Sequence, residues 1–141
     1  MRDKVFLDTN VIVYLFDKSE GKKHKTAKEL FNKCVLECEV FISAQVINEF
    51  VVIASQKIKN PLSLEDVKKR IAFLSDTAII VNISLATCNS AINLKSQHKI
   101  SYWDALIAAS ALENNCTVLY TEDLHDGLVI NDKLSVSNPF L

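Results

Sequence analysis

The chain has 141 residues, of which 49% are hydrophobic and only two are glycines, a composition typical of one globular domain with a sizeable core. Gly21 and Gly127 stand far apart, which excludes the glycine-rich loops that bind phosphate through backbone amides. The net charge of −1 favours no particular class of partner, although residues 1–70 carry a net charge of +3 and residues 71–141 one of −4.

The apolar residues predict strands and helices that alternate along the chain. In chain order, we predict a strand at 5–7, a helix at 11–16, a lysine-rich loop around Gly21, a helix at 26–36, a strand at 40–42, helices at 44–57 and 63–75, a strand at 78–81, helices at 84–98 and 102–113, a strand at 117–120, and short edge strands at 128–130 and 134–136. This pattern indicates an α/β fold, a three-layer α/β/α sandwich around a mostly parallel twisted sheet. Residues 1–141 are expected to form a single domain.

Cysteine spacing and hydropathy restrict the class of protein further. The four cysteines form no C-x-x-C pair and have no matching histidine pair, which argues against a zinc site. The first apolar run is too short for a signal peptide, and no run approaches the roughly 20 residues that span a membrane. We therefore expect a soluble, cytoplasmic protein without a membrane partner.

Asp8 directly follows the first predicted strand. Ligands of open parallel sheets bind at the carboxyl ends of the strands, so a carboxylate at this position is placed to act on a ligand. The alternative role is capping of the following helix, for which Thr9 and Asn10 are the better candidates.

Asp123 follows the last long predicted strand, as Asp8 follows the first. The alternative here is an ordinary polar turn, since aspartate and glycine are common turn residues. We assign that turn role to Glu122 and Asp126, although either could join a site formed by Asp123.

Glu49 lies on or beside the apolar stripe of the predicted helix 44–57, next to Phe50. Burial of an unpaired carboxylate costs several kcal/mol or forces the group to take up a proton. A buried lysine or arginine could compensate, but no basic residue precedes Lys57 in this helix. A metal cation is the simpler compensation.

Asp104 has two possible roles at the start of the predicted helix 102–113. The segment from Ser101 to Asp104 fits a capping box, in which the acid bonds back to the cap amide. The same position also directs a carboxylate towards the edge of the sheet.

Four carboxylates at one edge of a sheet would repel one another without bound cations. Oxygen ligands without histidine or cysteine suit Mg²⁺ or Mn²⁺. Such ions can activate water and neutralise phosphate oxygens during hydrolysis of a phosphodiester.

Four short segments resemble motifs of the PIN-domain family, and the likeness is strongest to the VapC-type toxin ribonucleases of toxin–antitoxin systems. They are Asp8-Thr9-Asn10, Asn48-Glu49, Tyr102-Trp103-Asp104-Ala105-Leu106-Ile107 and Thr121-Glu122-Asp123-Leu124. The likeness extends over nearly the whole chain, and the order and spacing of the motifs carry it.

The resemblance implies an α/β/α sandwich and Mg²⁺- or Mn²⁺-dependent endonucleolytic cleavage of RNA. It places the catalytic metal ligands at Asp8, Glu49, Asp104 and Asp123, with Asn10 and Thr121 as polar neighbours of these acids. It also implies a homodimer and an inhibitory protein antitoxin, which would make the chain the toxin of a type II pair.

Lysines near Gly21 have two interpretations. The first is a solvated helix face. The second is a surface that contacts the RNA backbone, with Lys22, Lys23 and Lys25 as the candidate residues.

Two alternative functions remain open at this point. A haloacid-dehalogenase-like phosphatase would use an Asp-x-Asp motif, but this chain has Asn10 at the second acidic position. A non-catalytic PIN fold could bind RNA or a protein without cleavage, although such a module has no evident need for all four acids.

Overall fold

The computed structural model describes residues 2–141 and contains a six-stranded sheet. The strands are β1 (Lys4–Leu7), β2 (Glu39–Ser43), β3 (Ile79–Val81), β4 (Val118–Tyr120), β5 (Val129–Ile130) and β6 (Leu134–Ser137). Their order across the sheet is β3-β2-β1-β4-β6-β5. All neighbouring strands are parallel except β5, which runs antiparallel to β6.

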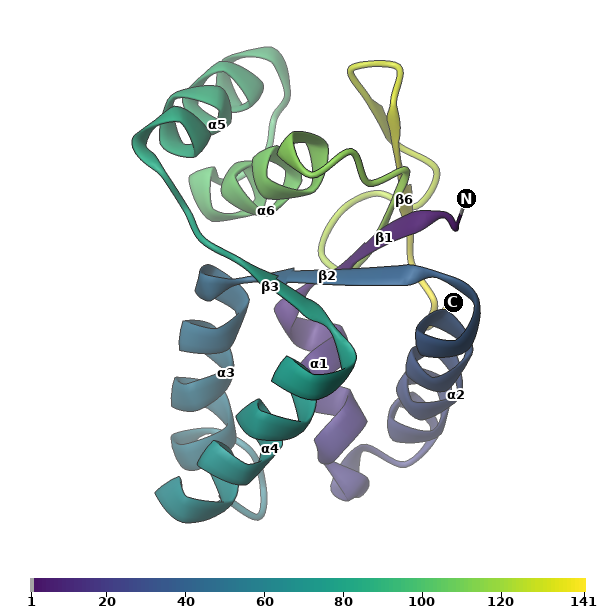
Figure 1. The fold of residues 1–141 in the computed structure, drawn as a ribbon, viewed down its shortest axis with the longest axis vertical. Helices are drawn as coiled ribbons and strands as arrows, with labels where there is room; N and C mark the ends of the chain where they lie inside the picture. The colour runs from purple at the N-terminus through teal and green to yellow at the C-terminus, as the bar shows by residue number, and fades with distance from the viewer. Residues whose placement is uncertain (1) are drawn as a thin grey trace.

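Helices cover both faces of this sheet (Figure 1). They are α1 (Thr9–Phe16), α2 (Lys22–Glu37), α3 (Ala44–Gln56), α4 (Leu64–Thr77), α5 (Leu85–Gln97) and α6 (Tyr102–Glu113). Helices α1 to α4 lie on one face, and α5 and α6 lie on the other. The predicted three-layer sandwich around a mostly parallel sheet is therefore confirmed. Among residues 2–141, no helix combines the length and apolarity that crossing a bilayer requires.

Serine side chains cap the N-termini of four helices. Ser43 caps α3, Ser63 caps α4, Ser84 caps α5 and Ser101 caps α6, in each case by accepting a hydrogen bond from a backbone amide of the first turn. Such a bond satisfies a donor that has no partner within the helix. These caps explain why the starts of these helices agree with the sequence pattern.

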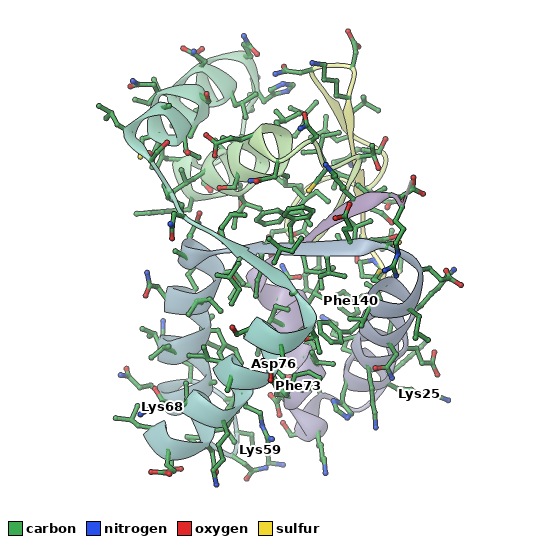
Figure 2. The ribbon with its side chains drawn as sticks, viewed as in Figure 1. Lys25, Lys59, Lys68, Phe73, Asp76 and Phe140 are labelled. Atoms are coloured by element: carbon green, nitrogen blue, oxygen red, sulfur yellow. The ribbon has the colours of Figure 1, made fainter. Side chains whose placement is uncertain are left out.

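The core lies on both sides of the central strands. Phe6 of β1, Ile42 of β2 and Leu119 of β4 are completely buried. Below the sheet, aromatic rings join the helices, because Phe73 of α4 packs against Phe16 of α1 and Phe31 of α2 at centroid distances of 6.1 and 5.8 Å (Figure 2).

The predicted loop around Gly21 is largely helical. A 3-10 turn at Lys18–Glu20 is capped by Asp17, and α2 begins at Lys22 rather than near residue 26. Gly21 joins the two with a φ of 57°, a left-handed conformation that glycine adopts without steric cost. The lysine-rich segment therefore lies mostly on a helix.

The strand order reverses direction at the boundary between β1 and β4. From β1 the chain builds outwards through β2 and β3, and it then returns to place β4 on the other side of β1. In open α/β sheets the crevice at such a reversal, outside the carboxyl ends of the strands, is the usual ligand site. Asp8 follows β1 at this crevice, and Thr121 follows β4.

Candidate functional site

Asp8 is held at the carboxyl end of β1 by both of its carboxylate oxygens. Oδ1 accepts a hydrogen bond from the backbone amide of Thr9 at 2.6 Å, and Oδ2 accepts one from the hydroxyl of Thr121 at 2.7 Å. Only 4% of Asp8 is exposed. Asp8 itself occupies the cap position of α1, because its backbone is extended and the helix begins at Thr9. The preference for Thr9 or Asn10 as the cap was therefore wrong.

Burial raises the pKa of Asp8 from 3.8 to about 7. The hydrogen bonds from Thr121 and Thr9 lower it, and the negative charges of Asp123 and Asp104 raise it. The charged form of Asp8 is thus destabilised by its surroundings, which is the condition that a bound cation would relieve.

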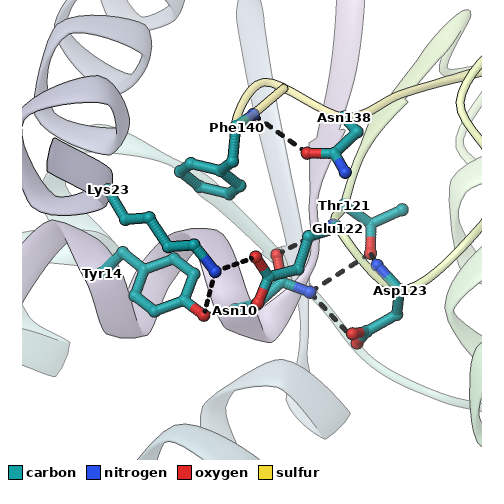
Figure 3. A network of polar contacts seen from close by, with 8 residues as sticks. All are labelled: Asn10, Tyr14, Lys23, Thr121, Glu122, Asp123, Asn138 and Phe140. Atoms are coloured by element: carbon teal, nitrogen blue, oxygen red, sulfur yellow. Dashed lines mark hydrogen bonds and ion pairs between the residues drawn. The ribbon is translucent and has the colours of Figure 1, made fainter. Parts of the chain in front are cut away.

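The Thr121 hydroxyl connects Asp8 with Asp123. It donates to Asp8 and accepts hydrogen bonds from the Asp123 amide at 3.0 Å and from Asn10 Nδ2 at 3.2 Å. Asn10 Nδ2 also donates to Asp123 Oδ2 at 3.1 Å, and Asn10 Oδ1 accepts from the Glu122 amide (Figure 3). Asn10 and Thr121 therefore fix the loop after β4 against the start of α1.

Asp104 enters the site from the other face of the sheet, at the first turn of α6. Its amide donates to Ser101 Oγ at 3.0 Å. The reciprocal bond of a capping box, in which the Ser101 amide donates to the Asp104 carboxylate, is absent among residues 2–141. Burial raises the pKa of Asp104, and the charges of Asp123 and Glu49 raise it further.

The structure brings three of the four candidate acids into one cluster. One carboxylate oxygen from each of Asp8, Asp104 and Asp123 lies within 4.8 Å of the others. Glu49 is outside this group of three, but it lines the same cavity and accepts a hydrogen bond from the Thr9 hydroxyl. Glu49 is partly buried, at the edge of the apolar stripe that includes Val46 and Phe50.

A cavity of about 760 Å³ extends from this cluster along α1 and α3. Asn10 and Tyr14 of α1 and Asn48 and Glu49 of α3 line it, and Lys57 lies at its far part with Lys59. The cavity thus has an acidic end at the sheet, whereas the lining away from the sheet combines two acids, Asp17 and Glu20, with the two lysines. Figure 2 shows Lys59 away from the sheet, between the end of α3 and the start of α4.

Glu122 and Asp126 have other partners than the acidic cluster. Glu122 accepts hydrogen bonds from the Tyr14 hydroxyl and from Lys23 Nζ, the latter at 2.9 Å (Figure 3). Asp126 Oδ1 accepts from the Asn138 amide at 2.8 Å. Both contacts agree with the structural role assigned to these two residues.

The three candidate RNA-binding lysines lie on α2 and not along the main cavity. Lys23 forms an ion pair with Glu122, and Lys22 and Lys25 are exposed to solvent. Figure 2 shows Lys25 on the outer side of α2. The lysines that line the cavity are Lys57 and Lys59, which the sequence analysis did not identify as candidates.

The spacing of residues along α3 could have indicated that Lys57 lines the cavity. Glu49, Ile53 and Lys57 are four residues apart and all line the cavity, as expected for positions on one helix face. Gln45 continues this series by one turn towards the sheet and also lines the cavity. By contrast, the hydrogen bond between Thr9 and Glu49 depends on the packing of α1 against α3 and has no sequence signature.

Comparison with known proteins identifies the family. The family model of the PIN domain matches residues 5–125. The chain belongs to the PIN-domain family. No curated protein matches the sequence significantly.

Solved structures of toxin–antitoxin systems share this PIN fold. A toxin–antitoxin complex from Klebsiella pneumoniae is 24% identical, with a TM-score of 0.70 over 96% of this chain and 97% of that one. DNA-bound VapBC from Salmonella typhimurium is 16% identical, with a TM-score of 0.69 over 97% and 98% of the two chains. VapC20 from Mycobacterium tuberculosis, a sarcin–ricin loop cleaving toxin, is 18% identical, with a TM-score of 0.66 over 82% and 86%. At these identities the likeness establishes the fold.

The acidic cluster of this PIN domain fits a hard divalent cation. Its donors are carboxylate oxygens, the ligand type that Mg²⁺ and Mn²⁺ prefer. Among the residues that the structure describes, the one ion pair joins Lys23 to Glu122, so the three aspartates have no basic partner. A bound cation would supply the compensating charge.

Proposed function

We propose that this PIN domain is a metal-dependent endoribonuclease and the toxin of a type II toxin–antitoxin pair. The observation that carries the proposal is the convergence of Asp8, Asp104 and Asp123 within 4.8 Å at the crevice between β1 and β4. Glu49 completes the proposed set of catalytic acids from the side of α3. Mg²⁺ is the proposed cofactor, and Mn²⁺ is expected to replace it.

The protein residues have separate tasks in this proposal. Asp8, Asp104 and Asp123 hold the metal, while Thr121 and Asn10 keep Asp8 and Asp123 in register through their hydrogen bonds. The Thr9 hydroxyl orients Glu49 towards the same cavity. When bound, the metal activates a water molecule and neutralises charge on the phosphate oxygens.

The cavity supports a polyanionic substrate. Its acidic end would hold metal, and Lys57 and Lys59 would contact phosphates further along the strand. The exposed lysines of α2, Lys22 and Lys25, together with Lys23, are the alternative backbone contacts.

The similar structures support the proposal of a protein partner. The Klebsiella and Salmonella structures are toxin–antitoxin complexes, and we propose an antitoxin segment that covers the same cavity in this protein. We also propose that the toxin forms a homodimer.

A cleavage assay with matched variants tests the ribonuclease. Structured RNAs are incubated with the protein in Mg²⁺, in Mn²⁺ or in chelator, and the products are separated on a denaturing gel. We expect cleavage only with a divalent ion. Asp8→Asn and Asp104→Asn should each reduce the rate by roughly three orders of magnitude, because metal assistance contributes several kcal/mol to the transition state.

Asp126→Asn is the control, because Asp126 lies in the same loop as Asp123 and its Oδ1 accepts a bond that asparagine can also accept. This variant should cleave at the wild-type rate. Cleavage that persists in chelator and in both cluster variants would exclude the proposed mechanism. Tight RNA binding without any cleavage would instead identify a non-catalytic module.

A further inference from the structure

A second cavity of about 640 Å³ lies beside the main cavity. It shares Gln45, Asn48, Glu49 and Trp103 with the main cavity, so these four residues separate or border both. Ala44, Asn82, Ile83 and Leu106 complete its lining. Its volume lies within the roughly 300–1,000 Å³ of sites for small organic ligands.

The described lining of this cavity contains no lysine or arginine. A phosphate group would therefore find no counter-charge there. The apolar side chains Ile83 and Leu106 alternate with the amides of Gln45, Asn48 and Asn82. Such a mixture suits a flat, neutral ligand with hydrogen-bonding edges.

Trp103 supplies the aromatic face of the cavity. It is 61% exposed although it lies directly beside Asp104 at the start of α6. Tyr102 contacts it edge to face at a centroid distance of 5.6 Å, an arrangement that leaves the indole free to stack on a ligand. Unpaired bases of RNA are commonly recognised by stacking on such side chains.

Gln45 provides an independent sign of a missing ligand. Its Nε2 donates to the backbone carbonyl of Trp103 at 3.1 Å, which fixes the orientation of the amide. Its Oε1 is buried and has no hydrogen-bond partner within residues 2–141, and the residue as a whole is 7% exposed. A buried acceptor without a partner costs free energy, and an N–H of a ligand in the cavity that Gln45 lines would satisfy it on contact.

We propose that this second cavity binds one unpaired nucleobase of the RNA beside the phosphate to be cleaved. The base stacks on Trp103 and presents its N–H donors to Gln45, while the exposed amides of Asn48 and Asn82 bond its remaining edge. This inference rests on the proposed ribonuclease function and adds a base-binding subsite to it.

Trp103 is the only tryptophan of the chain, so its fluorescence reports on the subsite. Short single-stranded RNAs are titrated into the protein in chelator, which prevents cleavage. We expect saturable quenching by oligonucleotides that carry bases. An abasic ribose-phosphate oligonucleotide of equal length should leave the fluorescence unchanged, and equal quenching by both probes would overturn the proposal.

Variants of the cavity test the individual contacts by fluorescence anisotropy of labelled RNA. Trp103→Ala and Gln45→Met should each weaken binding about ten-fold, within the range measured for loss of a stacked base. Gln97→Met makes the same substitution on α5, outside both cavities, and should bind as the wild type does. Wild-type affinity in both cavity variants would overturn the proposal. The comparison of abasic and base-carrying probes on the wild-type protein needs no variant to fold.

The outcomes separate this inference from the ribonuclease proposal. Quenching that depends on the base, in a protein that cleaves no RNA, would support the subsite and contradict the proposed activity. Metal-dependent cleavage without base-dependent quenching would support the activity and contradict the subsite.

Discussion

At the scale of single residues, Asp8 makes the free energy of unfolding depend on pH. Its pKa in the folded protein is raised from 3.8 to about 7, with burial as the main cause. The folded protein therefore binds a proton more tightly than the unfolded chain does. This group contributes stability below about pH 4, and the contribution is lost as the pH rises to about 7.

We expect the metal-free protein to lose stability between these two pH values, by of order 4 kcal/mol from Asp8 alone. Thermal unfolding in chelator, followed by circular dichroism, measures the effect. Asp8→Asn should abolish this part of the pH dependence. In the wild-type protein, added Mg²⁺ should recover the stability that is lost near pH 7. An identical pH profile for the variant would contradict the assignment of the shift to Asp8.

Several of the residues around the cluster could be identified without a structure, and others could not. Position at the end of a strand was enough to group Asp8 with Asp123, because parallel strands end at one edge of the sheet. The absence of a hydrogen-bond partner for Gln45 Oε1 depends on how α3 packs against α1 and α6. The position of Lys57 and Lys59 in the lining of the main cavity depends on the same packing. Such packing links residues that are distant in sequence and has no local pattern.

At the scale of elements, two pairs of lysines are alternative contacts for the RNA backbone, one pair at the end of α3 and one on α2. Lys57 and Lys59 follow α3 and line the main cavity, whereas Lys22 and Lys25 are exposed on α2. The salt dependence of RNA affinity distinguishes them, because each lost phosphate contact reduces the slope of log K against log salt by about 0.7 for a single strand.

We expect Lys57→Gln combined with Lys59→Gln to reduce this slope by about 1.4. The pair Lys22→Gln and Lys25→Gln removes the same charge from α2 and is the matched control. A reduced slope in the α2 pair alone would show that α2, and not the end of α3, contacts the RNA. Titrations at several salt concentrations by anisotropy provide the measurement.

Most boundaries of the helices and strands follow from local signals, namely apolar periodicity and serine caps. The start of α2 was missed because residues 22–26 are mostly basic and polar and present no apolar face. In α5, helical spacing relates Leu85, Cys88, Ala91, Ile92 and Lys95. The structure buries Ala91 and Leu94 and exposes Leu85 and Ile92. Periodicity could not decide between these overlapping faces, since the contact with α6 makes that choice.

At the scale of the whole molecule, α5 presents apolar side chains that the chain itself does not cover. Leu85 and Ile92 are exposed, and their separation of seven residues places them on one helix face. Exposed apolar patches of this kind commonly mark protein interfaces. We therefore expect the proposed homodimer to use this face.

Sedimentation equilibrium gives the mass in solution. The wild-type protein should sediment as a dimer, and Leu85→Asp combined with Ile92→Asp should sediment as a monomer. Leu64→Asp alters an equally apolar and exposed residue at the start of α4 and should leave the dimer intact. A monomeric wild type, or a dimer that only Leu64→Asp disrupts, would contradict this expectation.

The placement of β1 beside β4 also bears on when the protein becomes active during its synthesis. Asp8 and Thr121 form a hydrogen bond although 113 positions separate them in the sequence. A ribosome synthesises β1 and α3 long before β4 and the loop that carries Asp123. Until then the nascent chain lacks β4, which is one of the two neighbours of β1, and Asp123, which is the third aspartate of the cluster. The proposed metal site can therefore form only after β4 and the loop with Asp123 have been synthesised.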